Sequence, residues 1–279
     1  MRQTKVRITM SVIVFFIVAT MTGSAAAKEC VFRMGYKPHA KEPYIFNDNS
    51  GIYHDVYGEA LKRIGCRLEI FRLPKRRIIQ KLKLGTIDFY PTFGYTDERA
   101  AFTYFIFNWL PHRGAVVTRD DIPPLDSLKD LMRYKPTLLK EIGGYSPMEA
   151  IPGKRFETTD IDIEKSFKLL LNKRIDAFYI QEIVAKYYLN NHPEIQGVRI
   201  HQNLFPPVQT KTLGFSRRSP YFREKINPDY DRRLPTSQHN PVTIIDENST
   251  AYRFAKSLEE LYKSGQIQKI TDRYLHQSN

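Results

Sequence analysis

The sequence has 279 residues, with 43 lysines and arginines against 30 acidic residues and a formal net charge of +13. The basic residues are dispersed and no nucleic-acid-binding motif occurs, so a basic surface is favoured over a nucleic-acid partner. The seven histidines form no His-x-x-His pair or Cys/His cluster, and there is no P-loop or Gly-x-Ser-x-Gly motif. The composition therefore predicts neither a metal site nor a cofactor.

The first 27 residues have the organisation of a secretory signal peptide. Arg2, Lys5 and Arg7 precede an uncharged stretch over residues 8–21, and small residues end in an Ala-x-Ala pattern at 25–27. This pattern predicts cleavage after residue 27 and a periplasmic protein. The alternative is an uncleaved N-terminal anchor.

Removing 27 of the 279 residues leaves 252, enough for two lobes with separate cores. An internal echo supports two similar lobes, because residues 81–91 (KLKLGTIDFYP) and 169–181 (LLLNKRIDAFYIQ) each run from an amphipathic helix into an Ile-Asp strand. Strand–helix–strand repeats predict an α/β fold with mostly parallel sheets flanked by helices. Ligands of such sheets bind beyond the carboxyl ends of the strands, so both echoes point their loops at one cleft.

The chain is expected to cross between the lobes twice, near residues 110–113 and 205–207. The predicted division is a signal peptide at 1–27, lobe 1 at 28–111 plus 210–279, and lobe 2 at 112–209. An insertion at about 222–248 interrupts lobe 1 and is rich in proline, asparagine and aspartate. A solvated loop is the expected structure for this insertion.

The stretch 84–105 (LGTIDFYPTFGYTDERAAFTYF) predicts an anion-binding loop. Residues 87–90 are short, apolar and aromatic, as in a buried strand. Thr96 is a candidate N-cap, and Arg99 would emerge from the first turn of the helix that follows. A strand that ends at a polar loop and a helix N-terminus brings backbone N–H groups, a hydroxyl and a guanidinium together, which suits a carboxylate.

These residues resemble the signature of the type II periplasmic solute-binding proteins, family 3, in which a G-x-x-D strand leads to a T-x-E-R turn. Residues 35–65 resemble the first strand, the Pro-aromatic loop and the first helix of that family. Residues 214–220 (GFSRRSP) resemble its returning strand. The resemblance implies a two-lobed α/β fold with a ligand cleft between the lobes.

The resemblance also implies roles for individual residues. The arginine at the position of Arg99 clamps a ligand carboxylate, and an aromatic residue at the position of Tyr44 covers the ligand. Arg77 is equally compatible with a helix arginine that contacts the ligand near the cleft and with an ordinary solvated residue of the helix. The predicted ligand-binding residues are Tyr44, Arg77, Thr92, Gly94 and Arg99 of lobe 1 and Gly144, Tyr145, Ser146 and Gln181 of lobe 2.

Two features of lobe 2 qualify this assignment. Residues 143–146 are expected to form a second helix N-terminus with Pro147 in the first turn, and a plain glycine turn is the alternative. Relatives that bind α-amino acids commonly have an acidic residue at the position of Gln181. A neutral amide offers hydrogen bonds without a charge to match an ammonium group, so Gln181 argues against specificity for α-amino acids.

Both cysteines open an apolar run, VFRMGY after Cys30 and RLEIFRL after Cys66. If these runs are neighbouring parallel strands, the two sulfurs start side by side, and a disulfide is expected in an oxidising compartment. Two free thiols are the alternative. Lys28 and Glu29 precede Cys30, so there is no lipobox, and lipid anchoring is not expected.

Three functions are compatible with the sequence. The first is a monomeric binding protein that captures a small polar, carboxylate-bearing, amino-acid-like ligand by hinge closure and is recognised by an ABC transporter or a sensor. The second is an enzyme like the periplasmic dehydratases of this fold, with Glu182 or Glu42 as general acid. The third is an interaction protein without a ligand that docks through the insertion.

Overall fold

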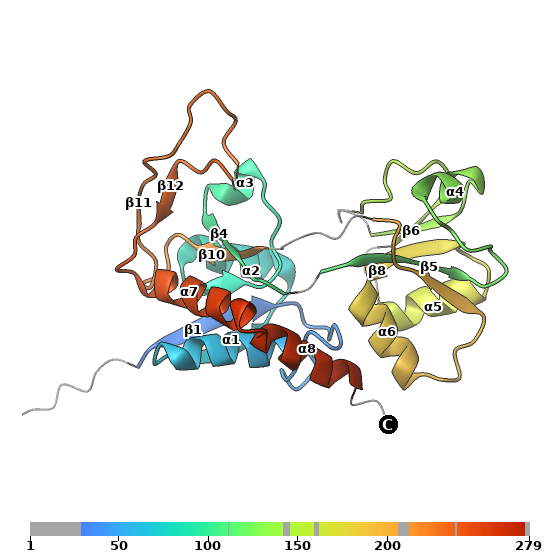
Figure 1. Ribbon diagram of the computed structural model, residues 1–279, viewed down its shortest axis with the longest axis horizontal. Helices are drawn as coiled ribbons and strands as arrows, with labels where there is room; N and C mark the ends of the chain where they lie inside the picture. The colour runs from blue at the N-terminus through green and yellow to red at the C-terminus, as the bar shows by residue number, and fades with distance from the viewer. Residues whose placement is uncertain are drawn as a thin grey trace, which may run out of the picture.

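The computed structural model describes residues 29–110, 112–141, 146–158, 162–205, 212–237 and 239–276. They form two lobes, each built on its own sheet, and the first strands and last helices of the chain share one lobe (Figure 1). The predicted signal peptide lies outside the described residues. In the described part of the chain, no helix is long and apolar enough to cross a membrane.

Lobe 1 is the lobe of the first and last elements. It contains β1 (Val31–Tyr36), α1 (Ile52–Arg63), β2 (Arg67–Arg72), α2 (Lys75–Leu84), β3 (Phe89–Tyr90), α3 (Asp97–Ala100), β4 (Thr103–Phe107), β10 (Thr212–Ser216), β11 (Glu224–Ile226), β12 (Thr243–Ile245), α7 (Thr250–Lys263) and α8 (Gln266–His276). Lobe 2 contains β5 (Gly114–Arg119), α4 (Leu128–Arg133), β6 (Leu138–Glu141), β7 (Arg155–Thr158), α5 (Ile163–Leu171), β8 (Ala177–Gln181), α6 (Glu182–Asn191) and β9 (Val198–His201).

The two five-stranded sheets have the same arrangement. The strand order is β2-β1-β3-β10-β4 in lobe 1 and β7-β6-β8-β5-β9 in lobe 2. In each sheet only the fourth strand of the order, β10 or β5, runs antiparallel to its neighbours. That strand is the first one after the chain arrives from the other lobe. The prediction of a two-lobed α/β fold with mostly parallel sheets is confirmed.

Apolar spacing and a glycine position the elements of lobe 1. Helix α1 buries Ile52, Val56 and Ala60, four residues apart, and packs against α7 and α8 (Figure 1). Gly85 ends α2 in the left-handed conformation with φ 73°, where a Cβ would lie 2.2 Å from the carbonyl oxygen of Arg218. Only glycine fits this turn, which sets where β3 begins.

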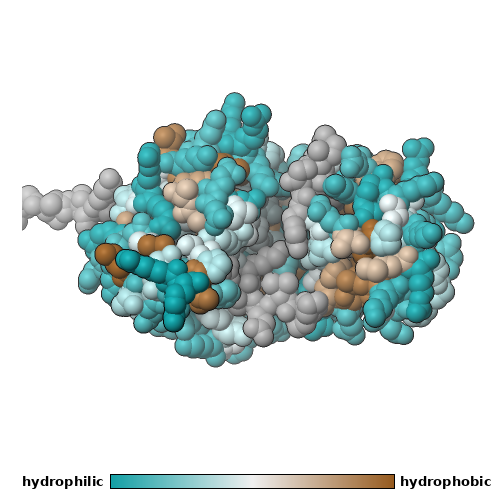
Figure 2. Space-filling model, turned by 90° about the horizontal axis from the view of Figure 1, so that it is seen from above, coloured by the Kyte–Doolittle hydropathy of each residue, from teal (hydrophilic) through white to brown (hydrophobic). Residues whose placement is uncertain are grey.

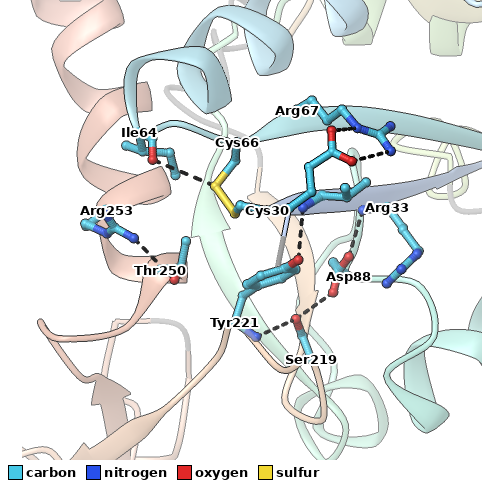
Figure 3. The surroundings of a disulfide bond; sticks show 12 residues. Cys30, Arg33, Ile64, Cys66, Arg67, Asp88, Ser219, Tyr221, Thr250 and Arg253 are labelled. Carbon is cyan, nitrogen blue, oxygen red and sulfur yellow. Dashed lines mark hydrogen bonds and ion pairs between the residues drawn. A yellow bond between two sulfur atoms is a disulfide. The ribbon is translucent and has the colours of Figure 1, made fainter. Parts of the chain in front are cut away.

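The predicted disulfide is present. Cys30 and Cys66 are bonded, with their Cα atoms 4.6 Å apart, directly before β1 and β2, whose parallel register pairs Val31 with Arg67. Figure 3 shows that the C-terminal part of lobe 1 meets the same corner, where the Tyr221 hydroxyl accepts a hydrogen bond from the Val31 N–H at 3.0 Å. The disulfide thus joins the starts of two strands whose other ends lead toward the cleft.

The echo in the sequence corresponds to the same bond in both lobes. The Asp88 carboxylate, before β3, accepts a hydrogen bond from the backbone N–H of Arg33 at 2.7 Å. The Asp176 carboxylate, before β8, accepts one from the backbone N–H of Thr137 at 2.8 Å. Each aspartate therefore holds the start of its strand beside the neighbouring parallel strand.

These two aspartates have pKa values displaced in opposite directions. Burial raises the pKa of Asp88, although hydrogen bonds from Ser219 and Arg33 oppose the shift. Its contribution to stability is complete below the ordinary carboxyl pKa and is lost as the pH rises through the raised value. Burial also acts on Asp176, but hydrogen bonds from Thr137 and Arg119 outweigh it and lower the pKa. The contribution of Asp176 is therefore lost as the pH falls.

Asparagine substitutions should reveal this difference. From about pH 4 to about pH 7, the unfolding free energy of Asp88→Asn should rise relative to the wild type, because the neutral amide escapes the cost of ionisation. The unfolding free energy of Asp176→Asn should fall relative to the wild type mainly from about pH 2 to about pH 4, because the lowered pKa lies below the ordinary carboxyl value. Urea unfolding at the ends of each interval measures the two changes. The same sign in both variants would contradict these assignments.

The insertion is largely exposed, as expected for a solvated loop, but it also contains a pair of short strands. Strands β11 and β12 pair antiparallel, with Lys225 opposite Ile244. In the loop between these strands, the Asn240 side-chain amide donates to the carbonyl oxygen of Asp231 at 2.9 Å. Asparagine amides thus supply bonds that a larger sheet would otherwise provide.

The predicted helix after residue 146 is also wrong, because residues 147–150 form turns. The Ser146 hydroxyl accepts a hydrogen bond from the Met148 N–H at 3.2 Å, and the Ser146 carbonyl accepts one from the Glu149 N–H at 3.2 Å. A serine that bonds to its own turn competes with helix formation. No second helix N-terminus follows Ser146 for an anion.

Candidate functional site

A cavity lies where the carboxyl ends of the two sheets face each other. It has about 320 Å³ of empty space, open solvent at its mouth included. Thr92 follows β3, Asn108 follows β4 and Gln181 ends β8, so both lobes contribute at the edge where α/β sheets bind ligands. The lining residues are Lys41, Tyr44, Tyr53, Thr92, Asn108, Leu110, His112 and Gln181.

Asn108 joins the crossing segment to lobe 1. Its side-chain N–H donates to the carbonyl oxygen of Pro91 at 3.0 Å, and its side-chain oxygen accepts from the Leu110 N–H at 3.2 Å. The side chain is buried, with the residue 1% exposed. Because Pro91 directly precedes Thr92, one buried amide fixes the loop after β3 relative to the start of the crossing.

Two tyrosines form the lobe 1 wall of the cavity. The rings of Tyr44 and Tyr53 stack with their centres 5.1 Å apart, and both residues are buried. Burial raises the pKa of both hydroxyls, and Tyr179 of β8 raises the pKa of Tyr44 further. Both hydroxyls therefore stay protonated at neutral pH and can donate hydrogen bonds to a ligand oxygen.

Arg72, at the end of β2, holds the loop that carries Tyr44. Its guanidinium donates to the carbonyl oxygens of Lys37, at 2.9 Å, and Phe46, and to the side-chain oxygen of Asn49 at 2.8 Å. A rigid guanidinium fork can bind several acceptors at once. Nothing in the sequence marks this residue, because an arginine at a strand end is typical of a solvated surface.

Arg72→Met should loosen the loop over residues 37–49 while the lobes stay folded. Each lost charge-assisted hydrogen bond is worth about 1.5–3 kcal/mol, so amide hydrogen exchange in the loop should accelerate roughly 10- to 100-fold. Arg76→Met, on the exposed face of α2, is the matched control and should leave the loop unchanged. Equal exchange rates in both variants would show that Arg72 does not hold the loop.

Gln181 and Glu182 face different surroundings at the end of β8. Gln181 lines the cavity, and its amide does not cap α6. The Glu182 carboxylate lies 3.6 Å from the Arg113 guanidinium and pairs with Lys186 one turn along α6. The negative charge of Glu182 is therefore balanced by the protein itself.

The structure places the predicted ligand residues in different surroundings. Tyr44, Thr92 and Gln181 come together in the cavity, while Gly94, Arg99, Ser146 and the exposed Arg77 do not line it. Gly144 and Tyr145 lie outside the described residues. The lining residues absent from the predicted set are Lys41, Tyr53, Asn108, Leu110 and His112. Leu110 and His112 belong to the crossing predicted near residues 110–113, and that crossing was the available signal.

Arg99 lies one loop away from the cavity. Thr96 caps α3 as predicted, since its hydroxyl accepts a hydrogen bond from the Arg99 N–H at 3.2 Å. The guanidinium donates to the Gly94 carbonyl at 2.9 Å and stands 4.5 Å from the centre of the Phe93 ring. Within the described ranges Arg99 forms no ion pair, so no carboxylate there neutralises its charge.

The loop that carries Tyr44 also joins the lobes through Phe46. The Phe46 ring lies 5.8 Å from the Tyr187 ring of α6 and 6.0 Å from the Tyr274 ring of α8, centre to centre. The Tyr274 hydroxyl donates to Asp55 of α1 at 2.9 Å. One loop therefore takes part in both the cavity wall and the contact between the lobes.

The chain belongs to the bacterial extracellular solute-binding proteins, family 3, because the model of that family matches residues 32–277. No match was found among curated proteins. This family is the one that the motifs of the sequence resemble, so the predicted membership is confirmed.

Solved structures of binding proteins share the fold. An ancestral arginine-binding protein bound to arginine has a TM-score of 0.60 at 20% identity, over 88% of this chain and 97% of that chain. Substrate-binding domain 2 of Lactococcus lactis GlnP, in an open conformation, has a TM-score of 0.58 at 19% identity, over 92% of this chain and 100% of that chain. At these identities the likeness establishes the two-lobed fold and not a ligand.

Proposed function

We propose that this solute-binding protein captures a small polar ligand bearing a carboxylate, of amino-acid size, in the cavity between the lobes. The observation that carries the proposal is the lining itself, in which Thr92 and Gln181 come from strand ends of different lobes. A ligand that contacts both lobes favours their closed arrangement by its differential affinity. The closed, monomeric protein is then recognised by an ABC transporter or a sensor in the periplasm.

The surroundings of Arg99 support a carboxylate as the common ligand group. Its guanidinium has a carbonyl acceptor and an aromatic face, and no carboxylate pairs with it in the described part of the chain. Thr92, two residues before Gly94, adds a hydroxyl inside the cavity. We propose that a ligand carboxylate draws Arg99 from Gly94 toward this hydroxyl.

The geometry gives the dehydratase alternative little support. A general acid must reach the ligand, but Glu182 is not among the described lining residues, and its carboxylate pairs with Arg113 and Lys186. Glu42 is exposed to solvent in the loop before Tyr44 and is not a lining residue. The family is also described as solute-binding proteins.

A thermal-shift screen of small carboxylates, amino acids and uncharged polar metabolites tests the proposed function. A true ligand at 100 times its dissociation constant should add about 2.7 kcal/mol to the unfolding free energy. The test variant is Thr92→Val, which removes a lining hydroxyl and should reduce the thermal shift caused by the ligand. A screen in which only uncharged compounds stabilise the protein would contradict the carboxylate assignment.

A further inference from the structure

The cavity has an uneven charge composition. Of the eight described residues that line it, none is aspartate or glutamate, while Lys41 and His112 carry basic side chains. Glu182, next to the lining residue Gln181, is paired with Arg113 and Lys186. The described lining therefore offers no carboxylate to a cationic group of a ligand.

This composition discriminates between ligand groups. An ammonium group that leaves water needs an anionic partner. A hydrogen bond to the amide oxygen of Gln181 offsets only part of the free energy that the ammonium group loses on desolvation. A carboxylate group of a ligand, in contrast, has several donors in this lining, because a lysine, the Thr92 hydroxyl and the side-chain N–H groups of Gln181 can all donate hydrogen bonds to it. The described part of the lining therefore favours anionic groups over zwitterions.

The backbone fixes the lysine residue in place. Lys41 and Ile45 exchange two backbone hydrogen bonds, of 2.8 Å and 3.1 Å, which close the loop around Tyr44. Arg72 binds the same loop through Lys37 and Phe46. The positive charges near the cavity therefore come from separate loops, one after β1 with Lys41 and one after β3 with Arg99.

We infer that the ligand is a small dianion, with one carboxylate bound by Arg99 and Thr92 and a second anionic group bound by Lys41 and His112. This inference rests on the proposed function and narrows its ligand class. The second group is a carboxylate or a phosphonate-like group, since both accept hydrogen bonds from an ammonium donor. Gln181 contacts the ligand as a neutral partner and selects against an ammonium substituent.

Calorimetry with matched compounds tests the inference. The dianion set is malonate, succinate, glutarate, adipate and 3-phosphonopropionate, and the matched set is aspartate, glutamate, asparagine and glutamine. The best dianion should bind about tenfold or more tightly than any aminated compound. Amino acids that bind more tightly than every dianion would overturn the inference and leave the proposed function standing. Binding by neither set would overturn the proposed function as well.

Two variants locate the determinants. Lys41→Met should weaken the best dianion about tenfold or more and leave a monocarboxylate of equal length unchanged. Gln181→Glu should weaken the dianion and improve binding of its aminated counterpart. Lys62→Met, exposed on α1, is the control for loss of one positive charge far from the cavity. A dianion affinity that falls equally in Lys41→Met and Lys62→Met would overturn the role of Lys41.

Discussion

Replacing Cys30 and Cys66 together by alanine is expected to lower the unfolding free energy by about 3–4 kcal/mol. The bond links cysteines 36 residues apart in the sequence, and its loss frees that loop in the unfolded chain. The paired strands β1 and β2 remain hydrogen-bonded in the folded state, so the fold should persist at reduced stability. Denaturant unfolding of both proteins under oxidising conditions measures the difference.

Reduction supplies the control for this prediction. A thiol reductant should destabilise the wild type by a similar amount and leave the double variant unchanged, because the variant has no bond to lose. A double variant within about 1 kcal/mol of the oxidised wild type would show that the disulfide contributes little.

The second large effect concerns Arg99 and ligand affinity. Arg99→Ala is expected to cost on the order of 2–5 kcal/mol of binding free energy, because a ligand carboxylate would lose its charged partner in a desolvated site. The backbone of Arg99 is held at both ends, by Thr96 at its N–H and by the Thr103 hydroxyl at its carbonyl, 2.8 Å away. These two backbone bonds do not depend on the side chain, so the turn around Arg99 should persist in Arg99→Ala, although the bond from the guanidinium to Gly94 is lost.

Arg99→Lys separates charge from geometry. It keeps the positive charge and loses the planar fork, so much of the affinity should still be lost. Calorimetry with the ligand found by the screen measures both variants. Binding of Arg99→Ala at wild-type affinity would remove Arg99 from the site and leave the cavity residues as the remaining candidates.

The sequence could predict the fold because its signals are local and repeated. The two Ile-Asp echoes mark β3 and β8, and both aspartates make the same backbone contact. The cysteines precede neighbouring parallel strands, so their pairing followed from the strand order. Such patterns can be recognised from the sequence alone, because each depends on neighbouring residues and on a common strand topology.

The cavity could be predicted only in part, because contacts between distant segments build it. Thr92 and Gln181 follow from strand ends and Tyr44 from the family resemblance, whereas the position of Asn108 depends on a bond to Pro91, 17 residues away. Arg72 acts on a loop more than 20 residues earlier, and no spacing rule identifies such a contact. The turn at 147–150 was missed because helix propensity there was overridden by bonds to Ser146.

Small-angle X-ray scattering with and without the identified ligand tests the central claim most directly, because that claim joins ligand binding to closure of the two lobes. We predict that the radius of gyration falls when the wild type is saturated with ligand and stays constant when Arg99→Ala receives the same concentration. A wild type whose radius of gyration does not change while calorimetry shows a saturated site would contradict closure around a ligand in this cavity.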